Sequence, residues 1–470
     1  MAKRKKITLH NVNIIGIADK GKSIGKTAEG HIVFVDNLVP GDVADILVLR
    51  KKKSYYEGIP LQIHSLSKDR IEPTCQHFGV CGGCKWQHLS YEKQLEHKFI
   101  VVRDVMQRIG KLNPELVRPI IGCDEIFRYR NKLEYSFSDK RWITNEEAAS
   151  EAVNLQTPAL GFHRPGFHDK IVDIQTCYLQ AFKSDEIRNF VRQYTLENGY
   201  TYYDTKTHKG DMRNMIVRNT TLGQWMVIMI FGHKDKAKIE GLMKAVAEKF
   251  PEIQSLLYVV NQKLNDTIFD QEVFVFKGKD YIEESLGDIT YRIGPKSFFQ
   301  TNTRQAIRLF DIAVSYADLK PEDNLYDLYT GLGSIALYVA HKVRQVVGIE
   351  EVEAAIDDAI ENMERNEVKN AVFYAGDVKN ILNPAFAEKH GKPDVIITDP
   401  PRAGMHEDVV ETLLELAAPR LVYISCNPAT QARDLALLSE KYEVTDIQPV
   451  DMFPHTHHIE CVARLVLKNQ

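Results

Sequence analysis

Residues 324–334 read NLYDLYTGLGS, and this stretch decides the fold of the C-terminal part of the 470-residue chain. An apolar, strand-like run ends in a glycine turn, and a helical pattern begins after it. Strand-like and helix-like segments then alternate strictly, which predicts a doubly wound parallel sheet, an α/β fold of the Rossmann type. The strand-like runs span residues 324–329, 345–350, 371–375, 393–398 and 419–425, and two more, 442–450 and 459–467, follow one another at the end.

Acidic side chains stand where these runs end. Glu350 closes the second run, Asp377 follows the third and Asp399 ends the fourth. Open α/β sheets bind ligands at these carboxyl ends, where a carboxylate can bond ribose hydroxyls, although each carboxylate could instead cap the next helix. The turn also carries Gly331 and Gly333 but no phosphate-holding lysine. Such an acidic, glycine-lined site suits S-adenosylmethionine, a sulfonium cation, better than NAD or ATP.

Residues 421–433, LVYISCNPATQAR, place Cys426 at the mouth of a site. An apolar strand ends just before this cysteine, and Pro428 suits the first turn of a helix. Free backbone N–H groups at that helix start would favour a thiolate. A lone cysteine is more often a small buried hydrophobe, so the interpretation of Cys426 as a nucleophile depends on the rest of the chain.

The cysteine content of the chain points to metal binding or catalysis. Seven cysteines are present, an odd number that does not indicate a disulfide framework. Cys75, Cys81 and Cys84 form the motif C-x5-C-G-G-C, which supplies three corners of a metal or cluster site. The fourth ligand is Cys123 or Cys177, and we favour Cys177 because Cys123 has apolar neighbours. Four cysteines can hold zinc or a [4Fe–4S] cluster, and their spacing does not distinguish the two.

Three domains are expected from the length and the patterns: residues 1–68, 69–290 and 291–470. Residues 7–65 alternate in short runs typical of a small antiparallel, OB-like barrel. Residues 69–290 predict an α+β domain that carries the cysteine site. The helix predicted over 91–109 could pack on the C-terminal domain.

Charge is unevenly distributed along the chain. Residues 1–65 contain 11 Lys and Arg against 6 Asp and Glu, although the whole chain has a net charge of −4. This basic end, with clusters at residues 3–6 and 50–53, suggests RNA binding, but a solvated lysine cluster explains the charge equally well. The basic residues among 128–132 could likewise contact RNA phosphate or form a solvated strand end. Residues 139–158 predict an inserted loop.

The sequence also bears on localisation. No apolar run reaches the roughly 20 residues that cross a bilayer, and the N-terminal residues lack the apolar stretch of a signal peptide. We therefore expect a cytoplasmic protein without membrane contact, and nothing in the sequence requires more than a monomer.

The motifs together resemble one family. The cysteine motif, FFQTN (298–302), DLYTGLG (327–333), DPPRAG (399–404), SCNPAT (425–430) and DMFPHTHHIE (451–460) resemble the bacterial RNA (uracil-5-)-methyltransferases. Within that family the nearest branch is the 23S rRNA enzymes of the RumA type, which carry a TRAM domain and an iron–sulfur cluster. The resemblance implies a [4Fe–4S] cluster on Cys75, Cys81, Cys84 and Cys177, a nucleophile at Cys426 and a base at Glu460. It also implies that Gln300, Tyr329, Glu350 and Asp399 line the cofactor and target-base site.

Some positions remain open or differ from the family. The FFQTN segment could close over the cofactor or could be a helix N-cap. The family commonly has Phe, Cys and Asn where this chain has Tyr329, Thr330 and Ser334, which affects details of the adenosine contact. One of His455, His457 and His458 could orient Glu460 or the target base, and the others are expected to be structural.

The implied chemistry follows from the weak nucleophilicity of uracil C5. Addition of a thiolate at C6 makes C5 an enolate carbon that can attack the methyl group of the sulfonium. A general base, here Glu460, must then remove the C5 proton. Asp399 could accept a hydrogen bond from uracil N3–H, which cytosine lacks. The target base must be unpaired or flipped out of its stack.

Three alternatives remain from the sequence. The same chemistry could act on tRNA, although the barrel and the cysteine motif favour 23S rRNA because the best-known tRNA enzymes lack both. A non-catalytic RNA-binding iron–sulfur protein is disfavoured because Cys426 and Glu460 are both present. An electron carrier is disfavoured by the large cofactor-binding sheet.

Overall fold

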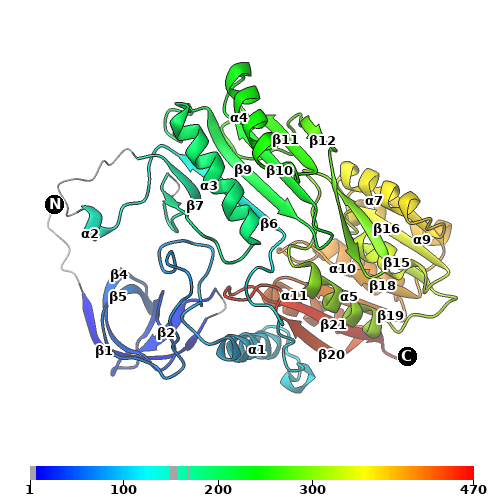
Figure 1. Ribbon diagram of the computed structural model, residues 1–470. Helices are drawn as coiled ribbons and strands as arrows, with labels where there is room; N and C mark the ends of the chain where they lie inside the picture. Colours follow the sequence, from blue (N-terminus) through cyan, green and yellow to red (C-terminus); the bar gives the residue numbers. More distant parts are fainter. Residues whose placement is uncertain (1–6, 19, 149–156, 168, 470) are drawn as a thin grey trace.

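The computed structural model describes residues 7–18, 20–148, 157–167 and 169–469 (Figure 1). The basic cluster at residues 3–6 and most of the second half of the predicted loop 139–158 lie outside these residues. The first half of that loop contains a helical turn, α2 (Asn145–Ala148). Among the described helices, none is long and apolar enough to span a membrane.

The N-terminal part is a closed five-stranded barrel in the order β1-β2-β3-β5-β4. Buried apolar side chains such as Val12, Val33 and Ile46 alternate with exposed ones and fill its interior. The expectation of an all-antiparallel barrel is wrong, because β3 and β5 pair in parallel. A closed ring with an odd number of strands cannot alternate in direction throughout. The strands are β1 (Thr8–Ile17), β2 (Ser23–Lys26), β3 (Ile32–Val35), β4 (Val43–Lys51) and β5 (Tyr55–Ser65).

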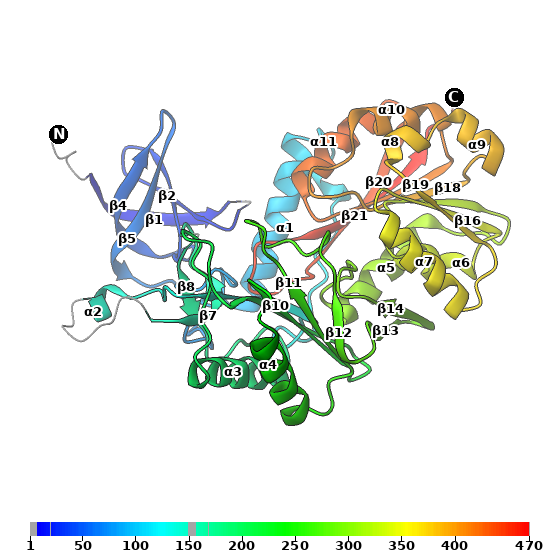
Figure 2. The same ribbon diagram turned by 90° about the horizontal axis from the view of Figure 1, so that it is seen from above.

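The central part is a seven-stranded mixed sheet in the order β12-β11-β10-β9-β6-β7-β8. Helices α3 and α4 cover one of its faces (Figure 2). Their buried residues, among them Ile187 and Leu242, form one core with the strands. The elements are β6 (Lys132–Ser138), β7 (Ala159–His163), β8 (Ile171–Asp173), α3 (Phe182–Glu197), β9 (Met212–Asn219), β10 (Trp225–Phe231), α4 (Lys236–Lys249), β11 (Ser255–Val260) and β12 (Phe274–Gly278).

The C-terminal part contains the predicted doubly wound sheet, in the order β17-β16-β15-β18-β19-β21-β20. β15 to β19 run parallel, β21 is antiparallel to them, and the edge strand β20 pairs antiparallel with β21 and so runs in the same direction as β15 to β19. The chain leaves β15 toward β16 and later returns to its other side at β18, so the carboxyl end of β15 is the switch point where such sheets bind ligands. The strands are β15 (Asn324–Leu328), β16 (Gln345–Glu350), β17 (Ala371–Ala375), β18 (Val395–Thr398), β19 (Arg420–Ser425), β20 (Tyr442–Val450) and β21 (Glu460–Leu467).

Helices and one hairpin complete this part of the molecule. The hairpin of β13 (Ile282–Leu286) and β14 (Ile289–Ile293) contributes to the same core as α5 and α6. The helices are α5 (Thr303–Ala317), α6 (Ser334–Ala340), α7 (Glu353–Arg365), α8 (Val378–Ile381), α9 (Pro384–His390), α10 (Glu407–Leu416) and α11 (Pro428–Leu438).

The helix predicted over 91–109 is α1 (Tyr91–Arg108), and it packs against α11 rather than on the central sheet (Figure 2). Its Val102 and Met106 are fully buried in the C-terminal core. The segment that follows, with the short turn η1 (Pro114–Leu116), pairs with β20 through Val117 and Ile121. A part of the chain that precedes the central sheet thus completes the C-terminal one.

A buried ion pair ties α1 to the loop between β20 and β21. Lys98 and Asp451 are both fully buried, and Lys98 Nζ lies 2.6 Å from Asp451 Oδ1. Lys98 also donates to the Phe453 carbonyl at 3.2 Å, and the Tyr91 hydroxyl donates to Asp451 Oδ2 at 2.9 Å. These bonds fix the start of the loop 451–459.

We predict that Lys98→Met destabilises the protein by about 3–5 kcal/mol, because it leaves Asp451 buried without its partner. Lys93→Met is the matched control, since Lys93 pairs with Glu96 on the exposed side of the same helix; a surface pair of that kind contributes about 0–1 kcal/mol. Urea unfolding of both variants measures the difference. A further Asp451→Asn change should recover part of the loss, and equal effects of the two single variants would contradict the assignment.

Candidate active site and cysteine cavity

The turn after β15 has a backbone that few residues adopt. Tyr329, Gly331 and Gly333 have φ angles of 65°, 58° and 82°. A Cβ atom at Gly331 would meet nothing within 4 Å, whereas one at Gly333 would lie 3.3 Å from Ala359 and Phe373. Glycine is thus required at 331 by the backbone conformation and at 333 by both conformation and space.

Glu350, at the end of β16, holds this turn in place. Its Oε2 accepts from the Gly331 N–H at 3.1 Å, and its Oε1 accepts from the Val352 N–H at 3.0 Å. A carboxylate has further acceptor sites, so Glu350 can still bond hydroxyl groups of a ligand at the sheet edge.

Asp377 and Asp399, the other two acidic residues predicted at the strand ends, have different surroundings. Asp377 is the N-cap of α8 and accepts from the Lys379 N–H at 3.1 Å. For Asp377, the alternative that the carboxylate caps the next helix is therefore correct. Asp399 follows β18. Burial, and then repulsion from Asp327, raise its pKa to about 7. Asp327 itself lies inside β15 and accepts from Thr330 at 2.5 Å and from the Ala336 N–H at 3.0 Å.

Of the two roles considered for the FFQTN segment, the structure shows the helix N-cap. Asn302 is the N-cap of α5 and accepts from the Gln305 N–H at 3.2 Å. Gln300 is half-buried and its carbonyl accepts from Asn131 Nδ2 at 2.9 Å. Phe298 is 73% exposed. The cap accounts for Asn302 alone and leaves the side chains of Gln300 and Phe298 available at the surface.

Cys426 stands between β19 and α11, as the sequence indicates. Asn427 caps the helix by accepting from the Ala429 N–H at 3.1 Å, and Pro428 is its first residue. The expected thiolate is not favoured in the free protein, because burial, followed by repulsion from Glu460 and Asp399, raises the pKa of Cys426 to about 11. Burial therefore destabilises the Cys426 thiolate more than the helix N-terminus stabilises it.

Glu460 begins β21, directly beside Cys426 through the pairing of β21 with β19. It is 5% exposed, and burial, together with the charge of Asp399, holds its pKa well above the usual range. Arg402, in the DPPRAG motif, opposes both shifts: it bonds the Cys426 sulfur and attracts Glu460. The sequence analysis assigned no role to Arg402, although its motif was among those that carried the resemblance.

The three histidines have different surroundings. His455 is buried, stacks on Phe127 at 4.4 Å and contacts Gln94 through Nδ1 at 3.2 Å. His457 and His458 have ring centroids 4.2 Å apart. Burial, then His457 and Arg402, lower the pKa of His458 to about 3. His458 is therefore neutral and lies within electrostatic range of Arg402, whereas His455 is part of the scaffold.

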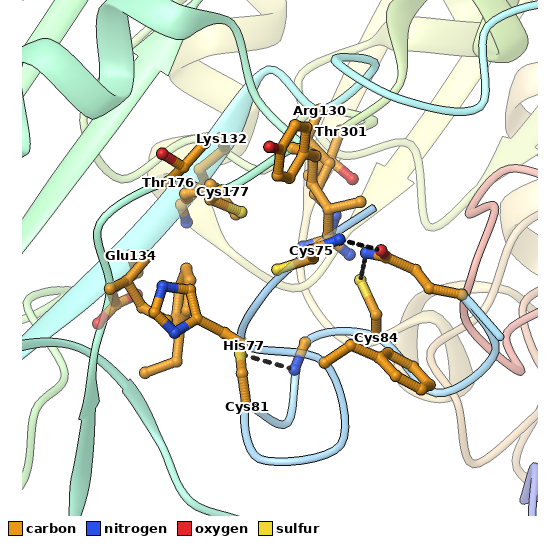
Figure 3. Close-up of a pocket in the computed structure, with 18 residues that line it drawn as sticks. Cys75, His77, Cys81, Cys84, Arg130, Lys132, Glu134, Thr176, Cys177 and Thr301 are labelled. Carbon is orange, nitrogen blue, oxygen red and sulfur yellow. Dashed lines mark hydrogen bonds between the residues drawn. The ribbon is translucent and has the colours of Figure 1, made fainter. Parts of the chain in front are cut away.

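Figure 3 shows the second group of predicted residues, in a cavity of about 400 Å³. Cys75, Cys81, Cys84 and Cys177 all line it, whereas Cys123 lies elsewhere and donates its S–H to the Asp451 carbonyl at 2.9 Å. The structure thus brings together the four cysteines that the sequence analysis grouped.

The surroundings of these sulfurs suit a bound metal group. The Gly83 N–H donates to Cys81 Sγ at 3.4 Å, and Gln87 Nε2 donates to Cys84 Sγ at 3.3 Å. Burial raises the pKa values of Cys81 and Cys84 to about 12. The cysteines are therefore protonated in the absence of metal, and binding would displace their protons.

The spacing of the sulfurs bears on which group they hold. Among the described residues, only Asp211, His233 and Asp235 form a set of three or more potential ligands with all ligand atoms within 4.8 Å of one another. Zinc bonds of about 2.3 Å would place tetrahedral sulfurs about 3.8 Å apart. No three of the four cysteine sulfurs lie that close together in the part of the chain that the structure describes. Asp211 is already paired with Lys238 at 2.6 Å.

Two residues of the segment 128–132, Arg128 and Asn131, are used inside the protein. Arg128 donates to the carbonyls of Cys177 and Gln180 at 2.6 and 2.7 Å. Asn131 bonds Gln300 and Thr303. Neither a solvated strand end nor a free phosphate contact describes these two residues.

Comparison with known proteins identifies the family. Residues 216–468 match the sequence model described as tRNA (Uracil-5-)-methyltransferase. The chain is 50% identical to an uncharacterized RNA methyltransferase of Bacteroides thetaiotaomicron, over 96% of this chain and 100% of that protein. It is 47% identical to another from Porphyromonas gingivalis, over 97% and 99%. The chain belongs to the RNA (uracil-5-)-methyltransferase family.

A solved structure extends this methyltransferase assignment to the whole chain. The tRNA (uracil-54, C5)-methyltransferase of Pyrococcus abyssi, in complex with S-adenosyl-L-homocysteine, aligns with a TM-score of 0.73 and 28% identity, over 97% of this chain and 100% of that one. The protein is an S-adenosylmethionine-dependent RNA (uracil-5-)-methyltransferase.

We predict that alkylation of Cys426 by iodoacetamide accelerates about tenfold per pH unit between pH 7 and 10, because the reactive thiolate fraction rises with pH below the pKa. Mass spectrometry of the Cys426 peptide measures the rate. Arg402→Met should slow alkylation at each pH, since it removes the cation that favours the thiolate. Arg433→Met, which changes an arginine on α11, is the control. A rate that is already constant above pH 7 would contradict the raised pKa.

Proposed function

We propose that this methyltransferase forms a covalent adduct between Cys426 and C6 of a uridine, and that Glu460 acts as the base. The observation that supports the proposal is that Cys426, Glu460 and Asp399 lie close enough to influence one another's charge, with the Arg402 cation acting on both Cys426 and Glu460. Cys426 follows β19, and Glu460 begins the neighbouring strand β21. Asp399 follows β18, the neighbour of β19 on its other side.

The first step is addition of the Cys426 sulfur to C6 of the target uracil. The thiol must lose its proton first, and Arg402 favours the thiolate that results. The C5–C6 double bond opens, and its electrons are delocalised over C5 and O4 as an enolate. Asp399 accepts a hydrogen bond from N3–H of the uracil, which selects uracil over cytosine.

The second step needs a base at C5. S-adenosylmethionine supplies the methyl group that C5 takes up. The C5 proton then passes to the Glu460 carboxylate, the C5–C6 double bond re-forms, and Cys426 leaves as a thiolate. A carboxylate with a raised pKa is a strong proton acceptor once ionised, and Arg402 supports the ionised form.

We also propose which residues hold the cofactor. Gly331 and Gly333 allow close approach of the ligand to the turn, and Glu350 is placed to bond its ribose. Tyr329 and Gln300 would contact the parts of the cofactor outside its ribose. Asp377 is the weakest member of the predicted set, because its carboxylate already caps α8.

We propose a [4Fe–4S] cluster on Cys75, Cys81, Cys84 and Cys177. The four thiols, their N–H donors, the cavity volume and the wide spread of the sulfurs all fit such a group. Methyl transfer moves no net electrons, so a structural role is the more economical one.

For the substrate we propose 23S rRNA, on the resemblance of the cysteine and active-site motifs to the rRNA enzymes. tRNA is the second candidate, and the similarity to the Pyrococcus abyssi enzyme over 97% of the chain favours it. The N-terminal barrel is proposed to bind RNA in either case. We infer a monomer that works in the cytoplasm.

We predict that Cys177→Ser lowers the iron content of anaerobically purified protein from about four irons per chain to near zero, because it removes one of four ligands. Cys123→Ser is the matched control and should retain its iron. Iron and acid-labile sulfide assays measure both. One zinc per chain, or equal losses in the two variants, would refute the cluster assignment.

A covalent trap tests the proposed mechanism and substrate together. The protein is incubated with S-adenosylmethionine and 5-fluorouridine-substituted rRNA or tRNA, and adducts stable to denaturation are mapped. Fluorine at C5 cannot leave as a proton, so the adduct should persist with rRNA and vanish in Cys426→Ala. Glu460→Gln should form adducts on unsubstituted RNA that release slowly. An adduct with tRNA alone would favour the second candidate, and no adduct with either RNA would refute the covalent route.

A further inference from the structure

Trp86, which lies just after the cysteine motif, connects three other parts of the molecule. Its indole N–H donates to the Gly21 carbonyl in the barrel at 3.1 Å, and its ring packs in a small core with Val39 of the barrel. Its backbone N–H donates to the His455 carbonyl at 3.1 Å. Its own carbonyl accepts from Gln94 Nε2 of α1 at 3.0 Å. Trp86 is 3% exposed, so these bonds are shielded from water.

Residues 20–22, between β1 and β2, form a turn that we call the barrel turn, and it packs against the loop that leads to Glu460. Figure 1 shows this loop, in red, reaching the barrel near β2. Gly21 has a φ angle of 75°. A Cβ atom there would lie 2.8 Å from His457 Cβ and 3.2 Å from Lys85 Cδ. Glycine thus allows an approach that a side chain would block, and the contact lies three residues from the proposed base.

Three lysines gather at this contact. Lys20 and Lys22 flank Gly21 in the sequence, and the side chain of Lys85 reaches the same glycine. Lys20 is exposed. The carboxylates that face the ammonium groups of Lys22 and Lys85 lie 4.0 and 3.9 Å away, so neither charge is tightly paired. Cations of this kind bind the phosphate groups of RNA.

We propose that Trp86 is a positioning residue for the RNA substrate. It fixes the barrel turn against the loop before Glu460, so that RNA phosphates on the turn and the target uridine at Cys426 are bound at one fixed separation. At a fixed separation the second contact becomes intramolecular, and the two contacts reinforce each other. The polar groups of Trp86 are all bonded within the protein, so Trp86 acts through the turn and not on the RNA itself. The inference rests on the proposed function, because the RNA must reach Cys426.

The test uses the full-length, iron-loaded enzyme and RNA that carries the mapped target uridine. Trp86→Phe removes the bond to the Gly21 carbonyl, and Gly21→Ala forces the barrel turn away from His457. We expect each variant to raise KM for the RNA roughly tenfold, with kcat and the KM for S-adenosylmethionine little changed. The double variant should be no worse than either single variant, because both changes break one shared contact.

Two matched controls separate this contact from general destabilisation of the barrel. Gly30→Ala adds a methyl group at another barrel glycine with a positive φ angle, 87°, where the closest atom would be Lys26 Cε at 4.0 Å. Trp225→Phe changes a half-buried tryptophan at the start of β10. Both controls should keep the KM of wild type for the RNA, and all variants should keep their iron.

Hydrogen exchange measures the contact in the absence of RNA. The amides of residues 454–459 and of the barrel turn should exchange faster in Trp86→Phe and Gly21→Ala than in wild type, because the loop and the turn no longer hold each other. The two controls should exchange at wild-type rates in both segments.

Each other outcome overturns the proposal. An unchanged KM for the RNA in Trp86→Phe and Gly21→Ala would show that the barrel turn does not position RNA, and equal losses in the controls would indicate general destabilisation. A lower kcat at unchanged KM would assign Trp86 to the chemical steps, and loss of iron would assign its effect to the cluster. Failure of the proposed function is distinguishable: wild type would then form no adduct at Cys426, while hydrogen exchange and direct RNA binding would still report on the contact.

Discussion

The buried ion pair of Lys98 and Asp451 holds the loop from which β21, with Glu460 at its start, begins. Two opposite charges that are buried away from water are stable only when they are paired and hydrogen-bonded. Here the Tyr91 hydroxyl and the Phe453 backbone supply the remaining hydrogen bonds of the pair. The loop continues to His455, whose carbonyl accepts from the Lys85 and Trp86 N–H groups at 2.8 and 3.1 Å. The Trp86 indole in turn donates to the Gly21 carbonyl in the barrel at 3.1 Å. One loop thus joins α1, the cysteine segment and the barrel to β21.

Desolvation governs the electrostatics of the active site. Cys426, Glu460 and Asp399 share a region with one cation, and burial raises the pKa values of all three. A site of this kind is close to neutral before its ligands arrive. Both of its proposed partners change that balance, since the cofactor is a cation and the target base brings polar edges. Burial therefore favours the protonated forms of these groups in the free protein, and the charge of Arg402 favours the loss of a proton from Cys426 and Glu460.

Much of the fold follows from local patterns in the sequence. The runs at 345–350, 371–375 and 442–450 coincide with β16, β17 and β20, because short runs rich in β-branched and aromatic residues favour strands. The choice of Cys177 over Cys123 also agrees with where the two residues lie. The features that could not be predicted from the sequence depend on the three-dimensional surroundings of each group. The raised pKa of Cys426 comes from burial, the role of Asp377 from a helix of four residues, and the parallel pair β3 and β5 from closure of the ring.

The position of α1 has a consequence for how the protein is made. Lys98 and Asp451 are 353 residues apart in the sequence, so a ribosome releases α1 long before α11 and β21 exist. Contacts of such long range form late. Until then Val102 and Met106 have no core to enter, and the apolar side of α1 remains exposed in the nascent chain. The C-terminal sheet cannot be completed by its own residues alone, so a fragment that begins after α1 would lack one wall of its core.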